Sequence, residues 1–165
     1  MNIKLVEIPD VSGHKCQVLS AIVDEQDESL FEEFLNEYSE QYPQEIEDIY
    51  NRLKFIGNEG GAREQFFKQN EGAPGDLVCA LYDQPDSNLR LYCIRFGSIA
   101  VILGGGGYKS KSIRSWQEDP KLSANAEMMK RISQIIYNAI KEKDIIHENN
   151  RLVGNMELTD LDYGN

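Results

Sequence analysis

Three short apolar segments follow one another in the middle of the chain and constrain its fold more than any other feature. They are residues 77–82, 89–96 and 99–103, and each is rich in branched or aromatic side chains. Residues 83–88 join the first two segments, and the dipeptide Gly97-Ser98 joins the second to the third. A two-residue connection is typical of a tight hairpin. The pattern therefore predicts a three-stranded antiparallel meander.

Two helical patterns precede the meander. Ser29 and Glu32 match a capping box in front of an apolar stripe with helical spacing. We expect this first helix to end near Tyr42, because the residue before a proline is disfavoured in a helix. Pro43 suits the first turn of a second helix, and Gly57 is its expected end. Together the two patterns predict a helical hairpin.

Both ends of the chain carry further elements. Residues 3–8 and 16–23 flank turn-forming residues, which predicts an N-terminal β-hairpin. Apolar residues at helical spacing over 128–140 predict a long C-terminal helix, and residues 151–158 suggest one more strand. The expected fold class is α+β. A chain of 165 residues and 18.8 kDa has the usual size of a single domain, so we expect one domain over residues 1–165.

The charges are unevenly distributed along the chain. It carries 28 acidic and 17 basic residues, a net charge of −11, which excludes a protein that wraps nucleic acid over its whole surface. Residues 24–48 contain eleven acids and no lysine or arginine, whereas residues 89–121 contain six bases and two acids. One interpretation is a local face that binds an anion. The other is that the bases neutralise the acidic helices through surface ion pairs.

Cysteines and histidines are few. Cys16, Cys79 and Cys93 form no Cys-x-x-Cys pair, so we expect buried reduced thiols and neither a disulfide framework nor a metal site. His14 and His147 are expected at the surface. No cofactor motif is present. Because no long apolar run or leader-like segment occurs, we expect a soluble, cytoplasmic protein without membrane association.

Four consecutive glycines, Gly104 to Gly107, follow the third apolar segment. Such a run could expose backbone N–H groups to a phosphate. It lacks the Gly-Lys-Ser/Thr ending of a Walker A loop, and no helical pattern opens directly behind it. The interpretation that we favour is a strand bent or bulged by glycine so that another part of the chain can approach closely.

Several segments together resemble a known family. A helical hairpin is followed by Asp76–Leu81, Leu89-Arg90-Leu91-Tyr92 and Ile99–Leu103, then by the glycines, Tyr108-Lys109-Ser110-Lys111 and a long helix. This order resembles the RelE/ParE toxin superfamily, in particular its HigB and phage-derived branch. That branch has an Arg-apolar-Tyr strand, a Val-Leu-Leu strand and a Phe/Tyr-x-Lys-Lys exit. The resemblance covers residues 29–143, so residues 1–28 are an N-terminal hairpin addition and residues 144–165 a C-terminal extension.

The resemblance implies a basic groove on the sheet, an antitoxin partner and cleavage of mRNA in the ribosomal A site. In that reaction a ribose 2′-OH attacks the adjacent phosphate, which requires cations, a stacking aromatic ring and a proton-transfer group. Matched to the family pattern, the catalytic residues are Arg90, Lys109 and Lys111, and the substrate-binding residues are Tyr108, Arg114 and Trp116. Strand alternation further predicts that Arg90 lies in the groove and that Arg95 points to the opposite face.

A second function is compatible with the same resemblance, namely a non-enzymatic relative that binds a protein target. Residues 70–81 contain no lysine or arginine, although catalytic members often carry lysines before the central strands. The chain is also acidic, whereas toxins that dock on ribosomes tend to be basic. A short helix-turn-helix reading frame beside the gene would favour the toxin. The sequence leaves open the target and the oligomeric state, a homo-oligomer included.

Overall fold

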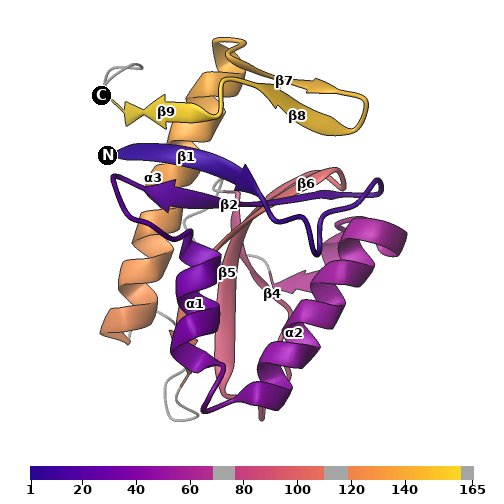
Figure 1. The fold of residues 1–165 in the computed structure, drawn as a ribbon, viewed down its shortest axis with the longest axis vertical. Helices are drawn as coiled ribbons and strands as arrows, with labels where there is room; N and C mark the ends of the chain where they lie inside the picture. Colours follow the sequence, from indigo (N-terminus) through magenta and orange to yellow (C-terminus); the bar gives the residue numbers. More distant parts are fainter. Residues whose placement is uncertain (69–76, 110–118, 161–165) are drawn as a thin grey trace.

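The computed structural model describes residues 1–68, 77–109 and 119–160, and shows an α+β fold built on one seven-stranded sheet (Figure 1). The strand order is β3-β4-β5-β6-β2-β1-β9, and neighbours are antiparallel except for the parallel pair β2 and β6. The strands are β1 (Asn2–Glu7), β2 (Gln17–Val23), β3 (Phe67–Lys68), β4 (Val78–Leu81), β5 (Leu89–Phe96), β6 (Ala100–Tyr108) and β9 (Glu157–Thr159). The predicted meander (β4–β5–β6) and N-terminal hairpin (β1–β2) are confirmed.

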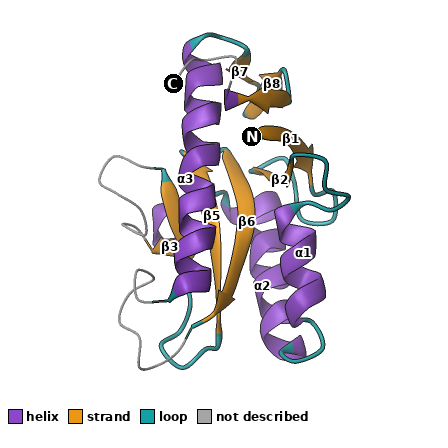
Figure 2. Cartoon of the chain, turned by 90° about the vertical axis from the view of Figure 1, so that its left-hand side faces the viewer, coloured by secondary structure: helices purple, strands orange, loops and turns teal. Residues whose placement is uncertain are grey.

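Helices cover both faces of the sheet. Helices α1 (Leu30–Tyr38) and α2 (Pro43–Phe55) pack on one face, and the long α3 (Pro120–Lys141) packs on the other (Figure 2). Alternate side chains of β5 pack into the cores on the two faces of the sheet. Leu91 and Cys93 belong to the core under α1 and α2, while Tyr92 and Ile94 belong to the core under α3. Burial on both faces explains why the sequence of this strand is almost continuously apolar.

The helical hairpin forms as predicted, with two differences at its ends. Ser29 Oγ accepts a hydrogen bond from Glu32 N at 3.2 Å, which confirms the cap of α1. Helix α1 ends at Tyr38 rather than near Tyr42, because residues 39–41 are exposed and bury no apolar surface. Helix α2 does not end at Gly57. It continues through a π-helical turn, Ile56–Gly60, as far as Gly61, whose φ is 73°.

The glycine run lies inside strand β6, which therefore extends to Tyr108 instead of ending at residue 103. Helix α3 and strand β5 approach the run closely. A Cβ at Gly104 would lie 2.3 Å from Met129 Sδ, and one at Gly106 would lie 1.8 Å from Arg90 O. The pairing of β5 with β6 also shifts register here, as in a β-bulge. The bulged strand is confirmed, and the phosphate-loop interpretation is wrong because the glycines are buried in the sheet.

The C-terminal part differs most from the sequence-based expectation. Helix α3 begins at Pro120 rather than at residue 128. Asp119 Oδ1 caps its start by accepting a hydrogen bond from Leu122 N at 2.9 Å. A separate hairpin follows, formed by β7 (Ile145–Glu148), which was not predicted, and β8 (Arg151–Gly154). The predicted strand over 151–158 is therefore two strands, β8 and β9, that belong to different sheets.

The three thiols are buried and unoxidised, as predicted. The sulfur atoms of Cys79 and Cys93 are 3.9 Å apart, and burial raises the pKa of Cys93. Burial also raises the pKa of Cys16 to about 12. Both histidines are exposed. Among the described residues, no helix has the length and apolar character needed to cross a membrane.

Candidate functional site: a charged cluster beside an aromatic cleft

At one end of the meander, a buried carboxylate forms ion pairs with three cationic side chains. Asp83 follows β4 and is only 6% exposed. Its Oδ1 atom lies 2.5 Å from Lys68 Nζ. Its Oδ2 atom lies 2.9 Å from Lys109 Nζ and 3.5 Å from Arg90 Nε. We call these four residues the Asp83 cluster.

The sheet brings these residues together from separate strands. Lys68 ends the edge strand β3, and Arg90 lies near the start of β5. Arg90 is paired with Gly107 of β6, so the chain reaches Lys109 just beyond the same end of the sheet. Lys109 is fixed there because its Nζ also donates to Gln84 O at 2.7 Å. The loop after β4 is thereby tied to the end of β6.

The electrostatics of the cluster keep Asp83 ionised. Burial alone raises the pKa of its carboxyl group, because a buried charge loses hydration. The nearby ammonium groups of Lys68 and Lys109 and the charge of Arg90 lower the pKa by more, so that it lies below its usual value. The carboxylate is therefore negatively charged at neutral pH and holds the three cations near one point.

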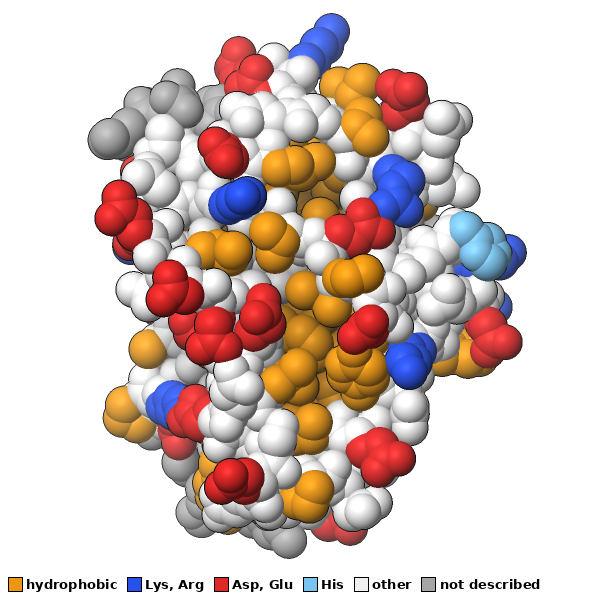
Figure 3. Space-filling model, in the orientation of Figure 1, with side chains coloured by type: hydrophobic (Ala, Val, Ile, Leu, Met, Phe, Trp, Pro, Cys, Tyr) orange, Lys and Arg blue, Asp and Glu red, His pale blue; other side chains and the backbone are white. Residues whose placement is uncertain are grey.

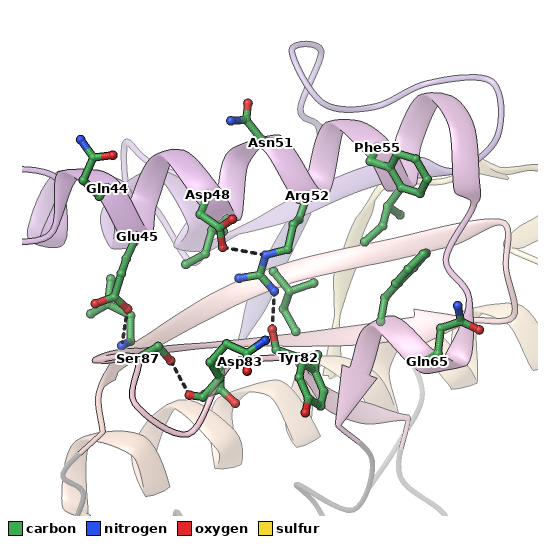
Figure 4. Close-up of a pocket in the computed structure, with 16 residues that line it drawn as sticks. Gln44, Glu45, Asp48, Asn51, Arg52, Phe55, Gln65, Tyr82, Asp83 and Ser87 are labelled. Carbon is green, nitrogen blue, oxygen red and sulfur yellow. Dashed lines mark hydrogen bonds and ion pairs between the residues drawn. The ribbon is translucent and has the colours of Figure 1, made fainter.

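A cleft of about 630 Å³ adjoins the cluster, between α2 and the loop that follows β4 (Figure 4). Phe55, Phe66 and Tyr82 line it with aromatic rings, and the first two rings meet edge to face with their centroids 5.9 Å apart. Tyr82 is 45% exposed. Lys68 Nζ lies 5.7 Å from the centroid of the Tyr82 ring, and Asp83 itself lines the cleft. Asp83 is therefore the residue that the cleft and the cluster share.

Two side chains of α2 hold the loop that forms the cleft wall (Figure 4). Arg52 Nε lies 3.0 Å from Asp48 Oδ2, and Arg52 Nη1 donates to Tyr82 O. Glu45 accepts two hydrogen bonds from Asn88, one from the backbone N at 2.9 Å and one from Nδ2 at 2.6 Å. These contacts fix the position of the loop relative to α2.

The structure brings together two of the three residues predicted to be catalytic, since Arg90 and Lys109 both pair with Asp83. Tyr108 adjoins Lys109 in sequence but points to the other side of the strand, where its ring centroid lies 6.3 Å from that of Tyr42. The remaining predicted site residues lie outside the described residues: Lys111, Arg114 and Trp116.

Arg95 lies on the face predicted for it. Its Nε donates to Ala62 O at 2.7 Å, and its guanidinium carbon lies 5.9 Å from the centroid of the Phe67 ring. Ala62 and Phe67 belong to the core under α1 and α2. Arg90 has the parity of the β5 residues that face α3, so strand alternation assigns it to the face opposite that of Arg95. That Arg90 lies in a substrate groove stays a prediction.

Sequence analysis missed the carboxylate at the centre of the site and two residues beside it, Lys68 and Tyr82. One signal was available. Asp83 directly follows a predicted strand whose neighbour carries Arg90, and charged residues at adjacent strand ends can meet. Lys68 gave no such signal, because its two-residue strand is too short to recognise from alternation.

No family model, curated protein or solved structure matches the chain. Within residues 1–68, 77–109 and 119–160, no group of three or more His, Cys, Asp or Glu side chains is arranged to hold a metal ion. The Asp83 cluster and the aromatic cleft beside it are therefore the features from which a function can be inferred.

Proposed function

We propose that the chain is a RelE/HigB-like toxin that cleaves mRNA on the ribosome and is neutralised by an antitoxin protein. The observation that carries the proposal is the junction of the Asp83 cluster with the aromatic cleft. Lys109 and Arg90 provide positive charge for a phosphate, and the half-exposed ring of Tyr82 is placed to stack a base. Proteins bind single-stranded RNA by this combination of cations and stacking rings.

The described residues supply part of the chemistry that such cleavage requires. When the ribose 2′-OH attacks the adjacent phosphate, its proton passes to solvent, the new O2′–P bond replaces the P–O5′ bond, and negative charge develops on the phosphoryl oxygens. Lys109 and Arg90 stabilise that charge, because cations held in a partly dry site interact with it strongly. Asp83 is a positioning residue that keeps both cations in place. Its lowered pKa makes it a weak base, so it does not accept the proton of the 2′-OH.

A specific observation favours a second function, that of a non-enzymatic binding protein with the same fold. The side chains of Lys109 and Arg90 are only 11% and 13% exposed, and both are already paired with Asp83. Buried ion pairs of this kind also occur as purely structural networks. In that case the exposed rings of Phe55 and Tyr82 would contact a protein target instead of a base.

Expression of the chain without its antitoxin distinguishes the two functions. We expect growth arrest, and primer extension should detect cuts in mRNA bound to purified ribosomes. Lys109→Met should lower the cleavage rate by about 100-fold, as loss of one stabilising group does. Lys54→Met is the matched control, because Lys54 is an exposed lysine of α2. If the wild-type chain neither slows growth nor cuts mRNA, the non-enzymatic function replaces the first.

A further inference from the structure

A second hollow lies on the outer surface of the helical layer, away from the aromatic cleft. Leu35 of α1 and Ser39, directly after this helix, line it on one side, and Pro43, Ile46 and Tyr50 of α2 line it on the other. Its volume is about 350 Å³. In Figure 3 apolar side chains form a strip between the two helices. We call this feature the α1–α2 groove.

Acidic side chains border the groove on both sides (Figure 3). Glu47 is part of its lining. Residues 24–48, which include α1 and the start of α2, contain eleven acids and no lysine or arginine. Among the described residues, only Glu37 and Asp48 of these eleven form an ion pair with a base. Glu45 and Asp48 line the aromatic cleft, but the other acids give the outer surface of the helical layer a negative charge that the chain itself compensates only in part.

The acids of α1 also repel one another. Burial raises the pKa of Glu33, and the nearby carboxylates of Glu28 and Glu37 raise it further. A carboxyl group in this position is less readily ionised than it would be in water, because its neighbours have the same charge.

We infer that the α1–α2 groove binds a partner protein through an amphipathic helix whose apolar face is flanked by lysine and arginine. A helix suits a groove between two helices, and α2 with its 13 residues is about 20 Å long, enough for three to four turns of a partner. The negative charge disfavours other occupants. Nucleic acid and anionic membranes are repelled, and a second copy of this chain would place two acidic surfaces face to face.

The groove and the candidate site lie on different sides of α2, with Asn51 between them lining both. Ile46 and Tyr50 face the groove, whereas Glu45 and Arg52 line the cleft beside Asp83. A partner in the groove therefore leaves the Asp83 cluster uncovered. The inference does not depend on mRNA cleavage, and binding can be measured without RNA.

The test uses the full-length protein and a fluorescein-labelled peptide of about 14 residues, in which leucine and lysine alternate with the helical period. Fluorescence anisotropy should detect binding of this peptide and none of a matched peptide with glutamate in place of lysine. We expect Ile46→Gln to weaken binding at least about tenfold, as loss of a central apolar contact does. Glu47→Lys should weaken it more than Glu157→Lys, which makes the same charge change on β9, outside the groove.

Any one of three results would overturn the inference. If Glu47→Lys and Glu157→Lys have equal effects, or if Ile46→Gln binds like the wild type, the peptide is attracted only to the general charge of an acidic protein. If light scattering shows a dimer that Ile46→Gln dissociates, the occupant is a second copy. Amide shifts of the wild-type protein on titration with the peptide must centre on Leu35, Ile46 and Tyr50. That measurement decides the matter even if Ile46→Gln does not fold.

Discussion

Asp83 Oδ2 lies 2.9 Å from Lys109 Nζ, and this pair joins the loop after β4 to the end of β6. The same carboxylate also contacts Lys68 and Arg90. The interaction therefore has two consequences. It ties the loop to the sheet, and it keeps three cations close to one another beside the aromatic cleft. A substitution that removes only one partner leaves buried charge without compensation.

Asp83→Asn should lower the free energy of unfolding by about 3 kcal/mol, because three cations then lose their shared counter-charge. Asp86→Asn in the same loop is the control, since Asp86 is exposed and its loss should change stability by about 0.5 kcal/mol or less. Urea unfolding of both variants measures the difference. Equal midpoints would show that the carboxylate contributes nothing specific to the fold.

The contribution of Asp83 should also depend on pH. Its folded-state pKa lies below the usual value near 3.8, so the ionised form is stabilised by folding. That stabilisation is fully present above about pH 5 and is lost as the pH falls through the lower, folded-state pKa. We therefore expect the stability difference between wild type and Asp83→Asn to shrink from about pH 7 to about pH 2. Urea unfolding across this range tests it, and a constant difference would contradict it.

The sequence predicted most of the fold where the signal is local. The bounds of β5 match the segment predicted over 89–96, and the capping box at Ser29 marks the start of α1. The predicted bounds of β6 were too short, because glycine weakens a strand pattern. In the structure the glycines have no side chains between β6 and α3, and this lets α3 pack closely. Strand β7 was missed because it is mostly exposed. Asn149 and Asn150, both at positive φ, form the kind of turn that could have indicated its hairpin.

The candidate site could be predicted only in part. The family pattern pointed to Arg90 and Lys109, which do meet. Asp83, which brings them together, depends on contacts among segments far apart in the sequence. The one local signal was the position of Asp83 directly after a predicted strand, and it does not specify the three partners. The position of Tyr82 could not be predicted for the same reason, since its backbone oxygen accepts a hydrogen bond from Arg52 of α2, which is distant in sequence.

The glycines of β6 should differ in their tolerance of alanine. Gly104→Ala places a Cβ against the flexible Met129 side chain, and should cost about 1–3 kcal/mol in stability. Gly106→Ala places it against the backbone oxygen of Arg90, which cannot move without disturbing the sheet, and should cost more. Thermal unfolding compares the two variants. If Gly104→Ala lowers stability more than Gly106→Ala does, β5 and β6 can separate at the bulge.

Core substitutions on the α1–α2 side of the sheet should be costly. Leu91 and Val101 are 1% and 0% exposed, and each change to alanine should lower stability by about 2–4 kcal/mol. His14→Ala and His147→Ala should each change it by less than about 0.5 kcal/mol, because both residues are exposed. Urea midpoints of the four variants check this. A large loss of stability on replacement of either histidine would contradict this prediction, because it would mean that the side chain makes a stabilising contact.

The last prediction concerns RNA and depends on the proposed function. Asp83 and a bound phosphate would compete for the same cations, so Asp83→Asn should strengthen binding of single-stranded RNA while it weakens the fold. Lys68→Gln should act in the opposite sense, weakening binding and reducing the slope of log affinity against log salt by about one. Lys54→Gln, a lysine of α2 outside the cluster, should change neither quantity. Anisotropy of a labelled oligonucleotide at several salt concentrations measures both. If Asp83→Asn and Lys68→Gln weaken binding equally, the carboxylate does not compete with phosphate for the cations. It then supports RNA binding by holding those cations in place.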